Sequence, residues 1–175
     1  MELNYPADAE AFRGEIREWL VANLPAGWGT PGFELTGEAR KKFVEEWPSK
    51  LFAGGWICAT WPKEYGGKGL TTMQGVVLSE EFAAVKAPLR ADFFGDTLVG
   101  PTLLQWGTEE QKQKYLAPLA KGEKIATFCL TEPEAGSDVV GLQAFAEQKG
   151  DRFILNGEKI WISLSTVADQ YLVMA

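Results

Sequence analysis

The chain has 175 residues, of which 46% are hydrophobic and 23% charged, the balance of a folded protein rather than of a disordered segment. Its 17 basic and 24 acidic side chains give a formal net charge of −7, which argues against a surface that neutralises nucleic-acid phosphates. Because the sequence contains no histidine, imidazole-based zinc clusters, Ser-His-Asp triads and imidazole bases are excluded, and no metal site is expected.

An amphipathic helix is predicted near the N-terminus, because apolar residues in the stretch DAEAFRGEIREWLVANLP recur at helical spacing. Asp8 is its expected N-cap, and Leu24-Pro25 is its expected end. The residues of its buried stripe are Phe12, Ile16, Trp19 and Leu20. A second helix is predicted from Thr36, kinked or broken at Pro48 and completed by a short piece that ends at Gly54-Gly55. Its inward residues are Ala39, Phe43 and Trp47.

The stretch WICATWPKEYGGKG is predicted as an irregular connection that carries two tryptophans. We interpret Trp56 and Trp61 as anchors packed on helices rather than as ligand platforms, because tryptophan is usually buried. Further helices are predicted over residues 72–85, around TLVGPTLLQWG, and over TEEQKQKYLAPLAKG. The last of these begins with the capping-box spacing of Thr108 and Gln111.

The hydrophobic period changes from helical to alternating after Gly122. EKIATFCLTE is predicted as a strand, LQAFAEQKGDRFILNGEKIWIS as hairpin-connected strands with turns at 149–151 and 156–157, and DQYLVMA as the start of another strand. The predicted fold class is therefore α+β, with an N-terminal all-helical domain over residues 1–122 and the start of an antiparallel β domain over residues 123–175. Because the sequence stops within an apolar strand, we expect a fragment of a longer enzyme or a chain that needs another polypeptide.

Membrane insertion and secretion are not expected, because no apolar stretch approaches the roughly 18 residues that span a bilayer and the N-terminus lacks a signal peptide. Cys58 and Cys129 lie in apolar segments and are interpreted as buried free thiols in a reducing compartment. A cytoplasmic location is therefore expected.

The turn EPEAGSD follows directly on the strand predicted over residues 125–131. Its composition is that of a polar surface turn, but Gly136 permits close approach of another group and Ser137 adds a hydroxyl beside free N–H groups, as a pyrophosphate site requires. Some thirty residues later NGEKIWIS places Trp161 on a neighbouring strand. Taken alone, Trp161 is interpreted as a core side chain of a hairpin, and the alternative is that its indole covers a flat heterocycle.

Several of these segments together resemble the acyl-CoA dehydrogenase family. The stretch CLTEPEAGSDVVG resembles the first family signature throughout its length, and NGEKIWIS resembles the strand that follows it. GWICATWPKEYGG, GPTLLQWGTEEQKQKYL and LAKGEKIATFCLTEP resemble family segments in the same order, so that the resemblance covers nearly the whole chain.

The resemblance implies an FAD site on the strand and turn. Its cofactor-binding residues would be Phe128, Leu130, Thr131, Gly136, Ser137, Trp161 and Ser163. The first three would lie along the isoalloxazine, with a hydrogen bond from Thr131, while Gly136 and Ser137 would meet the pyrophosphate and Trp161 would stack on the ring. Ser137 would also touch the CoA part of the substrate. Ser163 replaces a threonine usual in the family, and residues 164–166 replace a tight Asn-Gly turn.

The implied activity is α,β-desaturation of an acyl-CoA, in which a carboxylate base outside this chain removes the α-proton and the β-hydride passes to FAD N5. The family supplies that base from a C-terminal helical domain that is missing here, so this portion alone is expected to be inactive; neither Glu132 nor Glu134 stands at the position of the base. Implied partners are the acyl-CoA substrate, an electron-transfer flavoprotein or similar acceptor, and further subunits of a homo- or hetero-oligomer. The alternatives are a non-catalytic partner subunit or binding module of a heteromeric acyl-CoA dehydrogenase, and a flavin oxidase or hydroxylase on the same fold.

Overall fold

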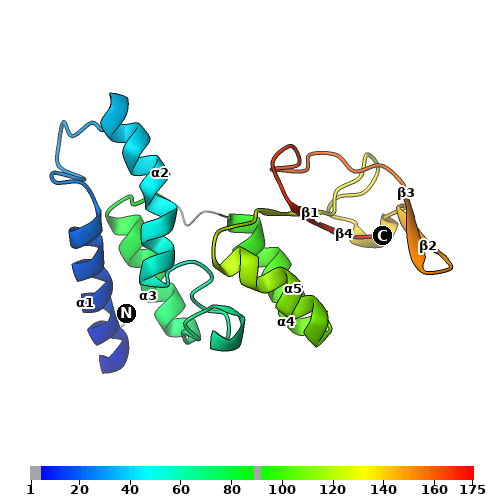
Figure 1. Ribbon diagram of the computed structural model, residues 1–175, viewed down its shortest axis with the longest axis horizontal. Helices are drawn as coiled ribbons and strands as arrows, with labels where there is room; N and C mark the ends of the chain where they lie inside the picture. Colours follow the sequence, from blue (N-terminus) through cyan, green and yellow to red (C-terminus); the bar gives the residue numbers. More distant parts are fainter. Residues whose placement is uncertain (1–4, 89–91) are drawn as a thin grey trace.

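The structure is a computed structural model that describes residues 5–88 and 92–175, with helices first and strands last (Figure 1). The helices are α1 (Ala7–Asn23), α2 (Gly37–Gly54), α3 (Thr72–Ala84), α4 (Gly100–Trp106) and α5 (Glu109–Ala120). The strands are β1 (Ala126–Cys129), β2 (Phe145–Lys149), β3 (Arg152–Asn156) and β4 (Gln170–Val173). Short helical turns are η1 (Lys63–Tyr65), the π-helical η2 (Gly95–Val99) and η3 (Val139–Gly141). This order confirms the predicted α+β class.

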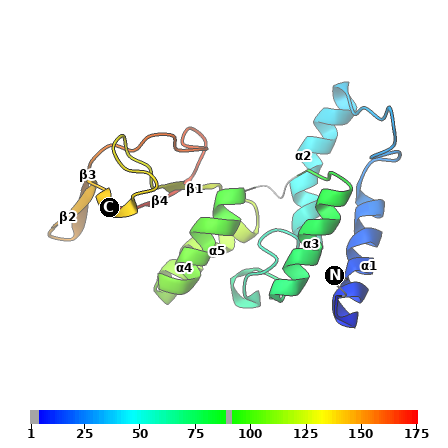
Figure 2. The same ribbon diagram turned by 180° about the vertical axis from the view of Figure 1, so that it is seen from behind.

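The pair α4–α5 lies between the first three helices and the strands in both views (Figures 1 and 2). Helix α1 packs along α3, while β1 contacts η2, so that the strands adjoin the helical core through the segment before α4. Within the described residues no helix combines the length and the apolar character needed to cross a membrane.

Helix α1 buries the predicted stripe, with Phe12, Ile16 and Leu20 inside and Trp19 partly buried. Its N-cap is Pro6, so the prediction of Asp8 is wrong by two residues. The fixed φ of proline suits this boundary, and Asp8 lies instead in the first turn, where its carboxylate faces the positive end of the helix dipole.

Helix α2 runs unbroken through Pro48, so the predicted break is wrong. Proline removes one helical hydrogen bond, but Phe43, Trp47 and Leu51 bury their side chains at four-residue spacing on both sides of it. Their packing offsets that loss. Ala39, predicted to face inward, is exposed. The helix ends at a left-handed Gly55, close to the predicted stop.

Trp56 and Trp61 are both buried in the core, which confirms their interpretation as anchors. The Trp61 indole N–H donates to the Asp96 carbonyl at 3.1 Å. Its ring also lies so close to Gly100 that a Cβ there would come within 1.8 Å of Trp61 Cζ2, which only glycine avoids. Trp61 thereby fixes η2 and the start of α4 against the first three helices.

Helix α5 begins with the predicted capping box, in which Gln111 N–H donates to Thr108 Oγ1 and Thr108 N–H donates to the Gln111 side chain. An equivalent box of Thr71 and Gln74 begins α3. Both boxes satisfy N–H groups that the first helical turn leaves without partners. The end of α5 delivers the chain to β1.

The strands form two separate pairs. Strands β2 and β3 make an antiparallel hairpin that turns at a left-handed Gly150, as predicted. Strands β1 and β4 pair in parallel, from Ala126 with Gln170 to Cys129 with Val173, so the predicted antiparallel start of the β domain holds only for the hairpin. Hydrophobic alternation is the same in parallel and antiparallel strands, so the sequence could not show that β1 and β4 pair in parallel. No strand is formed in residues 157–169, which is a correction to the predicted second hairpin at 156–157.

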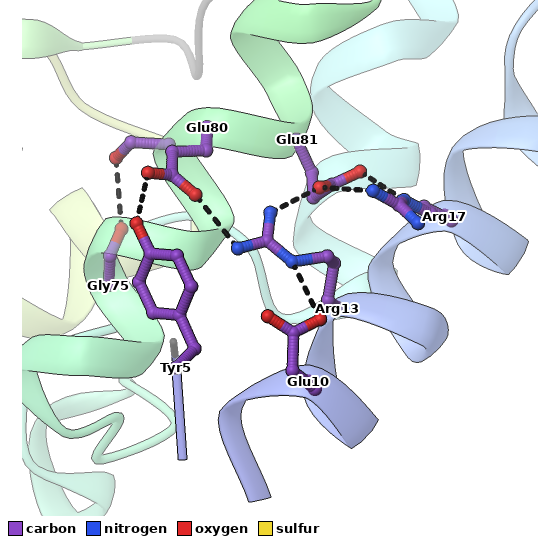
Figure 3. Close-up of polar contacts among 8 residues, drawn as sticks. Tyr5, Glu10, Arg13, Arg17, Gly75, Glu80 and Glu81 are labelled. Atoms are coloured by element: carbon purple, nitrogen blue, oxygen red, sulfur yellow. Dashed lines mark hydrogen bonds and ion pairs between the residues drawn. The ribbon is translucent and has the colours of Figure 1, made fainter. Parts of the chain in front are cut away.

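A network of ions joins α1 to α3 around the buried carboxylate of Glu81 (Figure 3). Arg13 donates to Glu81 at 2.5 Å and to Glu80 at 2.9 Å, and Arg17 donates to both Glu81 oxygens at 2.7 and 3.1 Å. Burial acts to raise the pKa of Glu81, but the hydrogen bonds from Arg17 and Arg13 outweigh it and hold that pKa below its ordinary value. Glu81 is therefore ionised and ties the two helices together.

Replacing Glu81 with glutamine should lower the free energy of unfolding by about 2 kcal/mol, because the amide cannot accept charge-assisted bonds from both arginines. Urea unfolding monitored by circular dichroism measures this. The matched control is Glu46→Gln, which removes an exposed pair with Lys42 at 3.8 Å and should change the value by less than about 0.5 kcal/mol. Equal effects of the two changes would contradict a special role for Glu81.

Candidate functional site

Strand β1 is attached to the helical part through its first residues. The Ala126 N–H donates to Asp92 Oδ2, and the Ile125 N–H donates to Asp169 Oδ2 at 3.0 Å. Lys124 Nζ donates to the other carboxylate oxygen of Asp169, Oδ1, at 2.7 Å. The start of β1 is thus fixed on one side by the segment before η2 and on the other by the residue that precedes β4.

The side chains of β1 alternate between two environments. Phe128 packs against the helical core together with Leu172 of β4. Thr127 and Cys129 are buried on the other side, and the Thr127 hydroxyl donates to the Ser163 carbonyl at 2.5 Å. Phe128 is therefore the predicted site residue whose side chain faces the helices rather than the turn.

The turn after β1 is organised around the Glu132 side chain, which is only 5% exposed. Its backbone closes the turn, since Glu132 N–H donates to the Ala135 carbonyl at 2.8 Å. Its carboxylate accepts hydrogen bonds from the N–H groups of Gln143 at 2.7 Å and Ala144 at 3.0 Å, and from Lys159 Nζ at 2.8 Å. One carboxylate thereby joins three segments that are distant in the sequence.

These donors hold the pKa of Glu132 at about 2, with the Gln143 N–H as the largest cause and the Lys159 ammonium next. A carboxylate with so low a pKa is a poor general base, and all of its partners are structural. Glu132 therefore organises the turn, with its carboxylate held by three donors.

Residues 160–163 lie alongside β1 and run in the opposite direction. Ile160 N–H donates to the Thr131 carbonyl at 3.0 Å, and the Thr127–Ser163 bond holds the other end. The segment is not a strand, which corrects the predicted placement of Trp161 on one. Trp161 has a left-handed φ of 57°, a conformation that costs a non-glycine residue roughly 1–2 kcal/mol, and its side chain is 87% exposed. The core interpretation of Trp161 is therefore wrong.

Gly136 and Ser137 follow directly on the backbone hydrogen bonds between Glu132 and Ala135 that close the turn. Within the described part of the chain their backbone N–H groups donate to no acceptor, and the Ser137 side chain is exposed. A Cβ at Gly136 would meet Thr131 Cγ2 at an ordinary 3.8 Å, and its φ is not left-handed. The fold itself does not require glycine here, which fits a position kept small for the approach of a ligand.

Thr131 lies close to Gly136 and accepts a hydrogen bond from Ile160, the neighbour of Trp161, whereas Ser163 lies opposite Thr127 of β1. Leu130 joins them through its carbonyl, which accepts from Lys159 Nζ at 2.9 Å. An exposed indole suits a flat ring, and unpartnered N–H groups suit a phosphate. The residues present therefore fit a flavin nucleotide, while the Phe128 side chain packs against the helical core.

Three supporting residues were missed by sequence reasoning: Thr127, Glu132 in its actual role, and Lys159. The signal available was a break in pattern at Thr127, whose hydroxyl lies within an apolar segment and needs a partner there, whereas Lys159 follows the polar residues of a turn and gives no such signal. Their partners lie up to 36 residues away in the sequence, which no local pattern reveals.

The hairpin of β2 and β3 is exposed along its whole length. Phe153 and Leu155 are 67% and 57% exposed, and on the paired strands they lie on the same face with Ala146. A two-stranded hairpin has little stability alone, and large exposed apolar side chains indicate a contact surface. The part of the chain that contains the strands therefore exposes apolar surface at Trp161 and on this hairpin.

Two family models match the chain: acyl-CoA dehydrogenase, N-terminal domain, over residues 6–123, and acyl-CoA dehydrogenase, middle domain, over residues 127–175. The acyl-CoA dehydrogenase IpdE1 of Mycobacterium tuberculosis is 36% identical over 171 residues, which cover 96% of this chain and 44% of that protein. The short-chain specific acyl-CoA dehydrogenase of Clostridium acetobutylicum is 39% identical over 176 residues, covering 100% of this chain and 45% of that protein.

Solved structures agree. The Tcur3481-Tcur3483 steroid ACAD matches with a TM-score of 0.74 at 36% identity, over 99% of this chain and 44% of that chain. The ChsE4-ChsE5 complex from Mycobacterium tuberculosis matches with a TM-score of 0.74 at 30% identity, over 99% of this chain and 43% of that chain. The chain spans less than half of the length of these relatives.

The low pKa of Glu132 predicts a pH dependence of stability. Because the pKa in the folded state lies below the ordinary value, ionised Glu132 stabilises the fold above about pH 4.5, and this contribution is lost as the pH falls towards 2. Glu132→Gln should therefore lower the free energy of unfolding at pH 7. It should also reduce the fall in that free energy as the pH is lowered from about 5 to 3. Urea unfolding at each pH tests this, with exposed Glu134→Gln as the control; a decline unchanged by Glu132→Gln would contradict the assignment.

Proposed function

The chain belongs to the acyl-CoA dehydrogenase family, and we propose that it is the N-terminal portion of an FAD-dependent enzyme that desaturates an acyl-CoA between its α and β carbons. The observation that carries the proposal is Trp161, held exposed in a strained backbone beside a turn with unpartnered N–H groups. Strained residues that the surrounding structure holds in place are found mainly at functional sites. As part of this proposal, residues 1–122 form the helical domain and residues 123–175 the first part of the flavin-binding β domain.

Each site residue has a task in holding the cofactor. The N–H groups of Gly136 and Ser137 would bind the pyrophosphate, and Ser137 would also contact the CoA part of the substrate. Trp161 would cover the ring, while Thr131 and Ser163 would supply hydrogen bonds at its edge and Phe128 and Leu130 would support it through β1. When bound, FAD supplies the acceptor for the β-hydride. The chain's own contribution is to orient the ring and exclude water from one side of it.

The base for the α-proton is proposed to lie outside these 175 residues. The Glu132 carboxylate already accepts hydrogen bonds from Lys159 and two backbone N–H groups, so it is not proposed as the base. The chain covers only 44% of IpdE1, which leaves more than half of such an enzyme to supply the base and to cover the acyl group. This portion alone should therefore bind flavin weakly and have no desaturase activity. In the assembled protein, reduced flavin would pass its electrons to an electron-transfer flavoprotein or a similar acceptor.

A second candidate is a partner subunit of a heteromeric acyl-CoA dehydrogenase. Its support is that two matching structures each pair two differently named proteins. The exposed apolar face of Phe153 and Leu155 is a surface on which another polypeptide would pack. In this candidate the chain still contributes flavin contacts, while the other subunit supplies the base.

Replacing Trp161 with alanine in the complete protein should weaken FAD binding about fivefold, because ring stacking contributes on the order of 1 kcal/mol beyond burial. Its free energy of unfolding without FAD should change little, since the side chain is 87% exposed. Flavin fluorescence titration and urea unfolding measure the two effects. Trp106→Ala is the matched control, because Trp106 is 80% exposed at the end of α4, and it should leave FAD affinity unchanged. Unaltered FAD affinity in Trp161→Ala would contradict the proposed site.

A further inference from the structure

Lys159 lies between the end of β1 and the turn, with its side chain only 13% exposed. Its ammonium donates to the Leu130 carbonyl at 2.9 Å and to Glu132 Oε1 at 2.8 Å. Two residues later the chain reaches Trp161, and Ile160 between them donates to the Thr131 carbonyl. One side chain thus connects the strand end, the turn and the segment that carries the exposed indole.

The ion pair between Lys159 and Glu132 also determines the net charge of the turn. Glu132 is buried in the turn that continues directly into Gly136 and Ser137, whose N–H groups are proposed to hold a diphosphate, and a buried carboxylate in this turn would repel that anion. The other two partners of Glu132, the Gln143 and Ala144 N–H groups, carry no net charge. Lys159 is the cation that neutralises it, and both side chains of this pair are far less exposed than those of the Lys42–Glu46 pair.

We propose that Lys159 and Glu132 are positioning residues for the flavin diphosphate: together they fix the backbone of residues 130–137, and Lys159 cancels the carboxylate charge that would otherwise oppose the anion. The inference rests on the proposed function, because it takes the diphosphate of FAD as the ligand. Neither residue contacts the reacting atoms, and both act through the N–H groups of Gly136 and Ser137.

The test compares FAD affinities in the complete protein at low ionic strength. Lys159→Met leaves the backbone partners of Glu132 in place but exposes the diphosphate to an uncompensated carboxylate, so the dissociation constant of FAD should rise at least about tenfold. Lys159→Arg keeps the charge and should stay within about threefold of the unchanged protein. Adding salt should recover part of the loss in Lys159→Met through screening.

The double variant Lys159→Met/Glu132→Gln separates the effect of the carboxylate charge on FAD binding from the effect of losing support for the backbone of residues 130–137. It removes both charges, so it should bind FAD at least about threefold more tightly than Lys159→Met alone. A purely structural role predicts that the double variant binds no better than the single one, and that result would overturn the inference. Unchanged affinity in Lys159→Met would overturn it as well.

Circular dichroism and urea unfolding accompany each variant. If Lys159→Met does not fold, the comparison of Lys159→Arg with Lys159→Gln decides, because an amide of similar length keeps the contacts but lacks the charge. FAD affinity equal in those two variants would overturn the inference. Absence of FAD binding to the unchanged protein would instead refute the proposed function, and the inference with it, so the two failures are distinguishable.

Discussion

The strand part of the molecule depends on one buried carboxylate. Glu132 accepts hydrogen bonds from two backbone N–H groups near β2 and from the Lys159 ammonium, while its own backbone closes the turn after β1. These bonds tie residues 142–144 to the turn and reinforce the backbone bond from Ile160 N–H to the Thr131 carbonyl, and they matter because the two strand pairs do not bond to each other. An ionised group is costly to bury, and its complete set of donors is what makes the arrangement stable.

The helical part supplies the rigid support on which this arrangement rests. Trp61 fixes η2 and α4 through its contact with Gly100, and Asp92 then holds the first N–H of β1. Phe128 inserts from β1 into the same core. Phe128 of β1 faces the helices, whereas the turn after β1 has unpartnered N–H groups at Gly136 and Ser137 and the segment beside it carries the exposed Trp161 indole. In the proposed function, a site built this way would be supported on one side by the helices and completed on the other by a further polypeptide.

Local signals in the sequence predicted local features well. The capping box of Thr108 and Gln111, the α1 stripe and the Gly150 hairpin each depend on residues a few positions apart. Features that depend on distant contacts were not predictable: α2 continues through Pro48 because of packing, and the parallel direction of β1 and β4 leaves no trace in alternation. At the candidate site the motif singled out the segments that are proposed to bind the flavin, but the backbone of Trp161 and the partners of Glu132 arise only when those segments meet.

Hydrogen exchange of the complete protein with and without FAD tests the central claim most directly, because it reports on individual backbone N–H groups. The account predicts that FAD slows exchange in peptides that contain Gly136, Ser137 and residues 160–163, and leaves α1 and α2 unchanged. The N–H groups of Gly136 and Ser137 have no acceptor within the described chain, so protection there must come from the ligand. Protection confined to other segments, with residues 136–137 exchanging equally fast in both states, would contradict the assignment of the site.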